Sequence, residues 1–453
     1  MNGIEMSKHH YIIRILNKKD SFVLESRLER KEMPEGKDKE SSDIEDLDPR
    51  IFRQPSRLGG GECGGCPILN FFSRLGLEEK GSNGDYYFWD IADLVEATEK
   101  EEFFLDLCKA SQCYKTYESI VENGYDMHLN QSKPITTFGE ILIDFTSQGK
   151  NEDGQMLYAR NPGGAPANVA VAAGRLGAYT AFIGKVGNDM HGKFLRSVLE
   201  KENVDIKGML MDDKYFTTLA FVEVSESGER TFAFARKPGA DTKIQTEELD
   251  IDILDQTYIF HVGSLSLTEQ PARDTTFYAV KRAKNKGSII SYDPNYRASL
   301  WKNEETAIEN MRSLIPYVDI MKIFDEEIEL LTGYQNMMEA VEELYRQGVK
   351  IIAVTLGGNG AYIYNKEGGC MVPGFTVEHV TDTNGAGDSF WGGFLYKISQ
   401  SDKQLDELTQ SELTEYARFG NAVASLCVEK KGAIPAMPKL SQVEERLEDS
   451  KWK

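Results

Sequence analysis

The sequence predicts an α/β fold with a mostly parallel central sheet for residues 134–453, preceded by an extension of unknown fold at residues 1–133. Two observations predict this organisation. From residue 135 onward, β-rich runs alternate with helical runs, an order that places parallel strands between two layers of helices. Before residue 134 the chain lacks this alternation, and residues 32–48 are dense in charge and serine, which is typical of a solvated linker.

The alternating elements can be assigned in order along the chain. Strands are predicted within residues 135–145, 178–187, 257–265, 288–294, 350–358 and 376–380. Helices are predicted within residues 163–177, 189–204, 271–287, 337–349 and 385–398. No internal repeat accompanies this pattern, so an array of identical units is not expected.

Residues 216–235 interrupt the alternation with two strand-like runs around Ser227-Gly228. Such a pattern predicts a β-hairpin without a crossover helix. Two interpretations stay open. The hairpin projects from the sheet as a lid near a site, or it forms an edge of the main sheet.

Composition excludes several classes of function. The chain has 453 residues and a formal net charge of −21, so it lacks the basic balance that nonspecific binding to nucleic acid or to an anionic membrane requires. It contains neither the run of about 20 apolar residues that crosses a bilayer nor a secretory signal pattern. Six cysteines in so long a chain predict reduced thiols and a cytoplasmic protein.

The extension is expected to be partly disordered and partly helical, with an amphipathic helix starting at Asp90. Cys63, Cys66, Cys108 and Cys113 have the residue type of a four-thiolate zinc site. Cys108, however, falls on the apolar stripe of the predicted helix, so buried thiols are the favoured interpretation. The sequence does not decide whether the extension regulates the protein, docks a partner or only decorates it.

Gly385, Ala386 and Gly387 precede Asp388 at the predicted start of an apolar helix. Backbone amides at a helix N-terminus favour an anion, and small residues let a phosphate approach them closely. An acid at this point suits a general base, which takes the proton of a hydroxyl group as its oxygen attacks a phosphoryl group. The alternative is that Asp388 only caps the helix.

Three further segments carry weaker signals. Residues 354–364 read as strand, Gly-rich turn and strand, which is typical of a nucleotide site or of a plain tight hairpin. Gly163, Gly164 and Asn168 open a small-residue helix, where close backbone approach serves a ligand or only helix–sheet packing. Asp144 ends a strand, where its carboxylate would accept hydrogen bonds from vicinal sugar hydroxyls, or it lies in a surface loop.

Seven segments, taken together and in order, resemble the ribokinase-like (PfkB) carbohydrate kinase family, and within it the fructokinases. They are GEILIDF, NPGGAPANVA, GKVGNDMHG, RKPGAD, YDPNYR, TLGGNGA and DTNGAGDSF. The resemblance covers residues 135–438 and leaves residues 1–133 outside. It implies a three-layer sandwich with a central mostly parallel sheet and a small β-sheet lid at about residues 145–162 and 214–237.

The resemblance also implies ATP-dependent transfer of the γ-phosphoryl group to a primary sugar hydroxyl. Asp388 would be the catalytic base, and the amides of residues 385–388 would form the anion hole. The residues implied to hold the sugar are Asp144, Gly163, Gly164 and Asn168. Those implied to lie at the nucleotide are Thr355, Gly357 and Gly360, with Asn421 near the adenine. Arg236 and Arg297 would face the substrates, unless they are surface salt-bridge partners.

Metal ions are implied at two places. Magnesium in this family usually rides on the nucleotide phosphates, helped through water by an Asn-or-Ser-x-x-Glu element. Here Glu327 keeps the acid, but Phe324 stands at the polar position, which puts that contact in doubt. A monovalent cation, potassium, is implied beside the anion hole with Asp382 and Asn384 as ligands, although Asn384 stands where Thr is usual.

The sugar-side segments supply few basic residues beyond Arg236 and Lys237, so an acceptor that already carries a phosphate is disfavoured. D-Fructose, giving fructose 6-phosphate, is the first choice. The alternative acceptor is 2-keto-3-deoxygluconate, whose carboxylate an arginine would pair, while nucleosides are disfavoured. A sugar-sensing regulator without turnover is a further alternative, which the intact 385–388 run opposes and Phe324 leaves open. The resemblance also implies a homodimer formed through the lid.

Overall fold

The computed structural model describes residues 133–448 apart from 225–229, together with four short strands farther upstream. The chain divides into two compact units, Met1–Gln131 and Ser132–Lys453. The described part of the first unit consists of two antiparallel hairpins that the sequence analysis did not predict. Their strands are β1 (His10–Leu16), β2 (Ser21–Arg27), β3 (Glu78–Lys80) and β4 (Tyr86–Phe88).

The predicted linker, the helix from Asp90 and the four candidate zinc cysteines lie outside the described residues. In the described part of the chain, no group of three or more His, Cys, Asp or Glu side chains has an arrangement that would hold a metal ion. Within the same residues, none of the helices combines the length and apolar character needed to traverse a bilayer.

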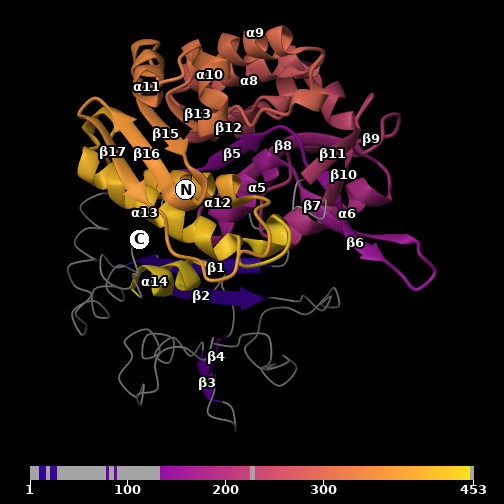
Figure 1. The fold of residues 1–453 in the computed structure, drawn as a ribbon. Helices are drawn as coiled ribbons and strands as arrows, with labels where there is room; N and C mark the ends of the chain where they lie inside the picture. Colours follow the sequence, from indigo (N-terminus) through magenta and orange to yellow (C-terminus); the bar gives the residue numbers. More distant parts are fainter. Residues whose placement is uncertain are drawn as a thin grey trace. The chain divides into compact units, whose positions relative to one another are not determined.

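A nine-stranded sheet forms the centre of the second unit, with the order β17-β16-β15-β14-β13-β12-β5-β8-β9 (Figure 1). The strands from β15 to β9 in this order are parallel, whereas β16 and β17 are antiparallel at one edge. The bounds are β5 (Ile135–Phe138), β8 (Thr180–Gly187), β9 (Met209–Asp212), β12 (Ile259–Gly263), β13 (Ile289–Asp293), β14 (Ile320–Phe324), β15 (Ile351–Thr355), β16 (Gly360–Asn365) and β17 (Gly368–Pro373).

Helices cover both faces of this sheet, as Figure 1 shows, because each face presents apolar side chains that must be buried. One face carries α5 (Ala165–Arg175), α6 (Met190–Lys201), α12 (Ala386–Gln400) and α13 (Gln410–Cys427), with α14 (Leu440–Glu448) packed on α13. The other carries α7 (Ile251–Gln256), α8 (Ala272–Asn285), α9 (Glu304–Leu314), α10 (Ile328–Thr332) and α11 (Met337–Arg346). The predicted α/β sandwich of three layers is confirmed.

Short 3-10 helices join several of these elements. They are η2 (Ala240–Lys243), η3 (Thr246–Glu248), η4 (Leu265–Leu267), η5 (Ala298–Leu300), η6 (Ile315–Tyr317), η7 (Asp325–Glu327), η8 (Gly357–Asn359), η9 (Leu405–Glu407) and η10 (Ile434–Ala436).

A smaller sheet of four strands, here called the lid sheet, has the order β11-β10-β6-β7. Its strands are β6 (Leu142–Lys150), β7 (Met156–Gly163), β10 (Leu219–Val224) and β11 (Arg230–Ala235). β10 and β11 pair antiparallel, which confirms the predicted hairpin, and β10 also pairs parallel to β6. The hairpin therefore belongs to the lid sheet, and its interpretation as an edge of the main sheet is wrong.

Two sequence predictions need correction. The single β-run predicted for residues 135–145 is two strands, because the chain leaves the large sheet after Phe138, passes Gly139 at a φ of 148°, and enters the lid sheet at Leu142. Residues 376–380 were predicted as a strand but form a mostly exposed irregular stretch. This stretch carries the chain from the edge strand β17 to the start of α12.

The site lies where this topology changes direction. From β5 the sheet continues through β8 to β9 on one side, and from β12 toward β17 on the other. Open α/β sheets bind ligands at the carboxyl ends of their strands beside such a switch point. Asp293 ends β13 there, and the chain after β5 leads directly to Asp144 in the lid sheet.

Candidate active site

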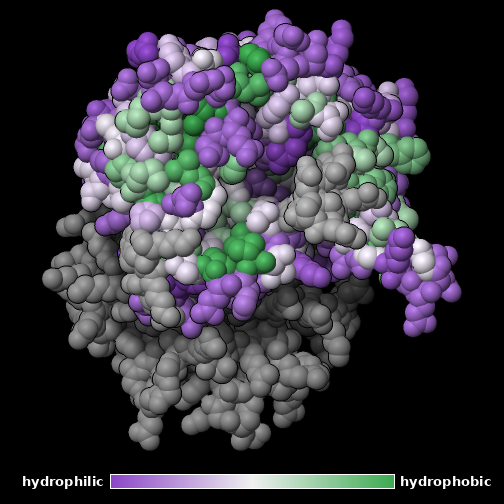
Figure 2. Space-filling view, viewed as in Figure 1, coloured by the Kyte–Doolittle hydropathy of each residue, from purple (hydrophilic) through white to green (hydrophobic). Residues whose placement is uncertain are grey.

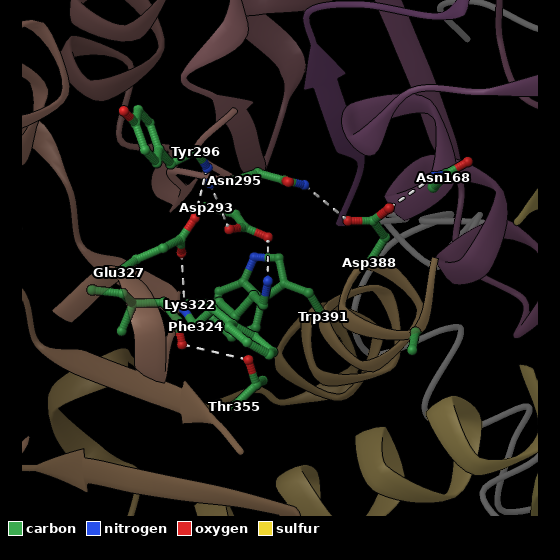
Figure 3. A network of polar contacts seen from close by, with 12 residues as sticks. Asn168, Asp293, Asn295, Tyr296, Lys322, Phe324, Glu327, Thr355, Asp388 and Trp391 are labelled. Carbon is green, nitrogen blue, oxygen red and sulfur yellow. Dashed lines mark hydrogen bonds and ion pairs between the residues drawn. The ribbon is translucent and has the colours of Figure 1, made fainter. Parts of the chain in front are cut away.

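Asp388 lies in the first turn of α12, and its carboxylate is buried. Gly385 is the residue that caps this helix, with a left-handed φ of 74° and no side-chain cap. The Asp388 carboxylate accepts hydrogen bonds from the side-chain amides of Asn168, at 2.7 Å, and Asn295, at 3.4 Å (Figure 3). The interpretation of Asp388 as a helix cap is therefore wrong, and its carboxylate is directed at side chains from α5 and the loop after β13.

The charge state of Asp388 depends on opposing influences. Burial raises the pKa of its carboxyl group above the ordinary value, and the negative Asp293 adds to this effect. The positive charges of Lys322 and Arg297 and the hydrogen bond from Asn168 act in the opposite direction. A carboxylate with a raised pKa is a stronger proton acceptor than an ordinary Asp, as a general base requires.

Asp144 comes to the same site from the lid sheet. Burial raises the pKa of its carboxyl group to about 7, against the positive charge of Arg297, and the negative charges of Asp388 and Asp382 raise it further. Asp144 stands opposite Asn161 in the β6–β7 register. The charges of Arg297 and Asp388 thus act on a carboxyl group that belongs to the lid sheet.

Gly163 and Gly164 make room for this arrangement at the end of β7. A Cβ atom on Gly163 would lie 2.1 Å from Oδ2 of Asp144. Gly164 caps α5 at a φ of 111°, and a Cβ atom there would lie 2.6 Å from the backbone oxygen of Glu140. A side chain at either position would displace its neighbour, so Gly163 leaves room for the Asp144 carboxylate and Gly164 lets the start of α5 approach the backbone of Glu140.

A buried ion pair that the sequence analysis missed lies beneath the start of α12. Lys322, in the middle of β14, donates a hydrogen bond from Nζ to Oδ2 of Asp293 at 2.8 Å, and both side chains are at most 5% exposed. Removing one partner of such a pair typically costs about 3–5 kcal/mol, because the other charge stays buried and unpaired. The signal in the sequence is a single lysine within the otherwise apolar run IMKIF.

Asn295 was also missed. It follows β13 in the YDPNYR segment with a φ of 46°, a left-handed conformation that Asn tolerates better than most residues. Its side-chain amide contacts Asp388 at 3.4 Å. The segment had been read only for Arg297, although an Asn after Pro is a frequent turn residue whose amide can be aimed at a ligand.

Glu327 is buried, and its carboxylate accepts hydrogen bonds from two backbone amides. One carboxylate oxygen accepts the amide of Tyr296 at 2.6 Å and the other accepts the amide of Phe324 at 3.0 Å. Burial and the nearby Asp293 raise the pKa of this carboxyl group. Both oxygens are engaged by backbone amides and Phe324 stands at the polar position, so this element does not fit direct coordination of magnesium, while the contact through water that the resemblance implies stays a prediction.

The predicted nucleotide residues lie at the antiparallel end of the large sheet. Thr355 ends β15, Gly357 starts the 3-10 turn after it, and Gly360 begins β16 at a φ of 99°. A Cβ atom on Gly357 would meet nothing within 4 Å, so the turn leaves open space above its backbone. Asn421 of α13 donates its amide to the carbonyl oxygens of Val372 and Pro373, each at 3.1 Å, which ties α13 to β17.

Arg236 and Arg297, the two arginines predicted to face the substrates, differ in burial. The guanidinium group of Arg236 is buried and bonds through all its nitrogens to protein groups, with Nε donating to Asp241 at 2.8 Å. The Arg236 side chain therefore neither faces the substrates nor forms a surface salt bridge. Its hydrogen bonds fix the chain just after β11, where it leaves the lid sheet. Arg297 is exposed, and its charge acts on both Asp144 and Asp388.

Asp382 and Asn384 lie in the loop that leads into α12. Oδ1 of Asp382 accepts the amide of Asn384 at 3.0 Å, and Oδ2 accepts the amide of Gly432 at 3.0 Å. The thiol of Cys427 contacts the backbone oxygen of Asn384 at 3.8 Å. These contacts fix the loop against the end of α13, directly before the glycine that starts the helix.

Comparison with known proteins agrees with this geometry. The profile of the pfkB family carbohydrate kinases matches residues 133–440. Probable fructokinase-5 of Arabidopsis thaliana is 41% identical over 307 residues, covering 67% of this chain and 94% of that protein. Fructokinase-1 of Zea mays is 38% identical over 317 residues, covering 69% of this chain and 97% of that protein.

Solved structures agree as well. A fructokinase from Xylella fastidiosa with bound ATP superposes with a TM-score of 0.66 at 33% identity, covering 70% of this chain and 99% of that one. A double-mutant fructokinase from Vibrio cholerae O395 with fructose, ADP and potassium bound has a TM-score of 0.63 at 31% identity, covering 69% and 98%.

The contact between Gly163 and Asp144 predicts the effect of one added methyl group. In Gly163→Ala the new Cβ would displace the Asp144 carboxylate, so the KM for the sugar should rise at least about 10-fold, the equivalent of losing one charge-assisted hydrogen bond. Gly358→Ala is the control for the sugar KM, measured at saturating ATP because Gly358 lies in the turn predicted for the nucleotide; its Cβ meets no protein atom within 4 Å. Steady-state kinetics of both variants decides the point, and an unchanged sugar KM in Gly163→Ala would contradict the role given to Asp144.

Proposed function

The chain belongs to the pfkB family of carbohydrate kinases, and we propose that it transfers the γ-phosphoryl group of ATP to D-fructose and releases fructose 6-phosphate and ADP. One observation carries the proposal. The buried Asp388 carboxylate belongs to the turn at residues 385–388 and accepts a hydrogen bond from the side-chain amide of Asn168, a residue proposed to hold the sugar. A single group therefore serves both the acceptor and the phosphoryl group.

The reaction follows from this position. Asp388 accepts the proton of a sugar hydroxyl while the hydroxyl oxygen forms a bond to the γ-phosphorus. The bond from the γ-phosphorus to the bridging oxygen breaks, and its electron pair leaves with ADP. The amides of the 385–388 turn, at the positive end of α12, receive the negative charge of the moving phosphoryl oxygens. Asp144 and Asn168 orient the sugar, so the attack is intramolecular in effect.

ATP and a divalent metal are the cofactors of this proposal. Thr355, Gly357 and Gly360 support a nucleotide site, since the open turn after β15 lets phosphates approach the backbone. A divalent ion bound to the nucleotide phosphates would neutralise part of their charge. Potassium is the proposed monovalent ion, with Asp382 and Asn384 in the loop before the 385–388 turn as its candidate ligands.

A neutral sugar is favoured by the distribution of charge. Arg236 is committed to Asp241, Thr268 and Leu265, which removes one of the two arginines available to an anionic acceptor. Arg297 is exposed, and its positive charge already acts on two carboxyl groups, those of Asp144 and Asp388, whose pKa values it lowers. D-Fructose fits this balance. 2-Keto-3-deoxygluconate depends on Arg297 alone to pair its carboxylate.

A sugar panel tests the proposal. Release of ADP is measured with fructose, 2-keto-3-deoxygluconate, glucose, ribose and adenosine, each with ATP and Mg²⁺. We expect the highest kcat/KM with fructose and formation of fructose 6-phosphate. Asp388→Asn keeps the side-chain shape and removes the base, so its turnover should fall by about 10²–10⁴-fold with a smaller change in sugar affinity.

Each other outcome of the panel has a defined meaning. Highest turnover with 2-keto-3-deoxygluconate would replace the proposed substrate while leaving the kinase activity. Sugar binding by calorimetry without turnover of any sugar would identify a sensing regulator. Near-normal turnover in Asp388→Asn would remove the base from the mechanism.

We also propose that the protein forms a homodimer through its lid sheets. Phe221 of β10 stacks on Phe145 of β6 at 5.2 Å between ring centroids and is still 36% exposed, and Phe216, just before β10, is 77% exposed. Figure 2 shows hydrophobic surface gathered at this end of the molecule, near the labels β10 and β11 of Figure 1. Exposed apolar patches of this kind mark interfaces between proteins.

Light scattering checks the dimer. The protein should have twice the chain mass at micromolar concentration, and Phe221→Glu should lower the mass toward that of one chain because it introduces charge into the interface. Tyr278→Glu, a change of another exposed aromatic residue on α8, is the control and should leave the mass unchanged. A single-chain mass for the unmodified protein would remove the proposal.

A cytoplasmic location completes the proposal. It is supported by the free thiols of Cys370 and Cys427 within the described residues, since reduced cysteines are typical of that compartment. Cell fractionation with an antibody against the chain would test it.

A further inference from the structure

Lys322 places a charge where the sequence pattern calls for an apolar residue. It is 4% exposed, and the other residues of β14 are Ile, Met, Ile and Phe. Burying an ammonium group is costly unless it is paired. The partner, Asp293, ends the neighbouring strand β13 (Figure 3). This buried pair therefore joins the carboxyl end of β13 to the middle of β14, at the level of the proposed active site.

The ammonium group faces more negative charge than one partner supplies. Burial alone would lower the pKa of Lys322, but Asp293, Glu327 and Asp388 together raise it above the ordinary value of a lysine. Lys322 therefore stays protonated, and its positive charge acts on three buried carboxylates. Two of these have other uses, because Glu327 binds backbone amides and Asp293 forms the direct ion pair. Asp388 is the one carboxylate of the three that the mechanism requires to change its protonation.

Gly387 brings the ammonium group against the turn that starts α12. A Cβ atom at this position would lie 3.0 Å from Nζ of Lys322 and 3.4 Å from its Cε. Any larger residue would press on the lysine, so the absence of a side chain at Gly387 lets the charge approach the backbone directly. In the proposed reaction this backbone receives the phosphoryl oxygens, and a fixed positive charge beneath it favours the negative transition state.

The groups that act on Asp388 come from several elements. The cations are Lys322 of β14 and Arg297 after β13, and the anions and thiol are Asp293 of β13, Asp144 of β6 and Cys427 of α13. Arg297 is exposed, so water screens its charge. Lys322 is buried and is screened much less. It is the cation of this set whose removal should change Asp388 most.

We propose that Lys322 is a positioning residue of the phosphoryl transfer: its ammonium group, paired with Asp293 and lying against Gly387, places a fixed positive charge beneath the 385–388 turn to which Asp388 belongs. The inference rests on the proposed sugar kinase activity. A plain structural role is the alternative, in which the Lys322–Asp293 pair only joins β13 to β14. That alternative predicts a loss of stability without any change in how the activity depends on pH.

Lys185 supplies a matched control. It is the buried lysine of β8 in the same sheet, with a side chain 6% exposed, and it pairs with Asp212 at 2.9 Å and Glu248 at 2.7 Å. Lys185→Met removes a buried, paired ammonium group just as Lys322→Met does, but no partner of Lys185 belongs to the proposed site. Both variants should lose thermal stability, whereas only Lys322→Met should alter catalysis beyond that loss.

The first measurement is kcat and kcat/KM as a function of pH for wild type, Lys322→Met and Lys185→Met. Lys322→Met should lower kcat by about 10²–10³-fold, the range found when one group that stabilises developing negative charge is removed. The sign of the pH effect follows from the charges. Lys322 lowers the pKa of Asp388, so its removal raises that pKa, and the acid limb of the profile should move to higher pH.

A double variant covers the case in which Lys322→Met does not fold. Lys322→Met combined with Asp293→Asn removes both charges of the pair and leaves no unpaired ion between the strands. Asp293 raises the pKa of Asp388 and Lys322 lowers it more strongly, so the acid limb of the double variant should lie between those of wild type and Lys322→Met. An acid limb at the wild-type position in both variants would overturn the proposal.

A second readout works without turnover. The titration of Asp388 is followed by carboxyl carbon NMR in the substrate-free protein, with the signal assigned from its loss in Asp388→Asn. If wild type turns over no sugar, the proposed function fails, while a higher titration midpoint in the Lys322 variants still supports the proposed effect on Asp388. An unchanged midpoint, or an equal rise in Lys185→Met, would contradict it.

Discussion

The burial of one carboxylate, that of Asp388, is the constraint on which the rest of the site depends. A buried carboxylate needs hydrogen bonds and positive charge, and these come from separate elements: Asn168 of α5, Asn295 after β13 and Lys322 of β14. Each of these elements must therefore bring one side chain to the same place. The parallel sheet meets that demand, because the carboxyl ends of its strands share one edge.

Hydrogen bonds to the central sheet also fix the position of α12. The indole nitrogen of Trp391 donates to the hydroxyl oxygen of Ser291 at 2.9 Å, and this hydroxyl group also bonds Nδ1 of His261 at 2.9 Å. Burial lowers the pKa of His261 to about 4, so the imidazole is neutral near pH 7 and the network keeps its form there. A helix anchored in this way one turn beyond Asp388 can present the carboxylate at a constant position.

Much of this arrangement was predictable from the sequence, because strand and helix periodicity and the small residues around Asp388 are local features. Lys322 was missed because a lone charge in an apolar run has no partner in the sequence; Asp293 lies 29 positions away and meets it only across the sheet. Arg236 was misjudged although its ion-pair partner Asp241 is only five positions away; the other acceptors of its guanidinium group, Thr268 and Leu265, meet it only in the fold. The break at Gly139 was missed because alternation describes a strand but does not say to which sheet it belongs.

Lid and main sheet bring two carboxyl groups, those of Asp144 and Asp388, into one electrostatic neighbourhood, where Asp388 raises the pKa of Asp144 and Arg297 opposes that effect. The most direct test of the account is a crystal structure with fructose, ADP, Mg²⁺ and aluminium fluoride bound. We expect two fructose hydroxyls on Asp144, the attacking hydroxyl within hydrogen-bond distance of Asp388, and the fluoride group on the amides of residues 385–388. A sugar bound with no hydroxyl near Asp388, or the fluoride group away from that turn, would contradict it.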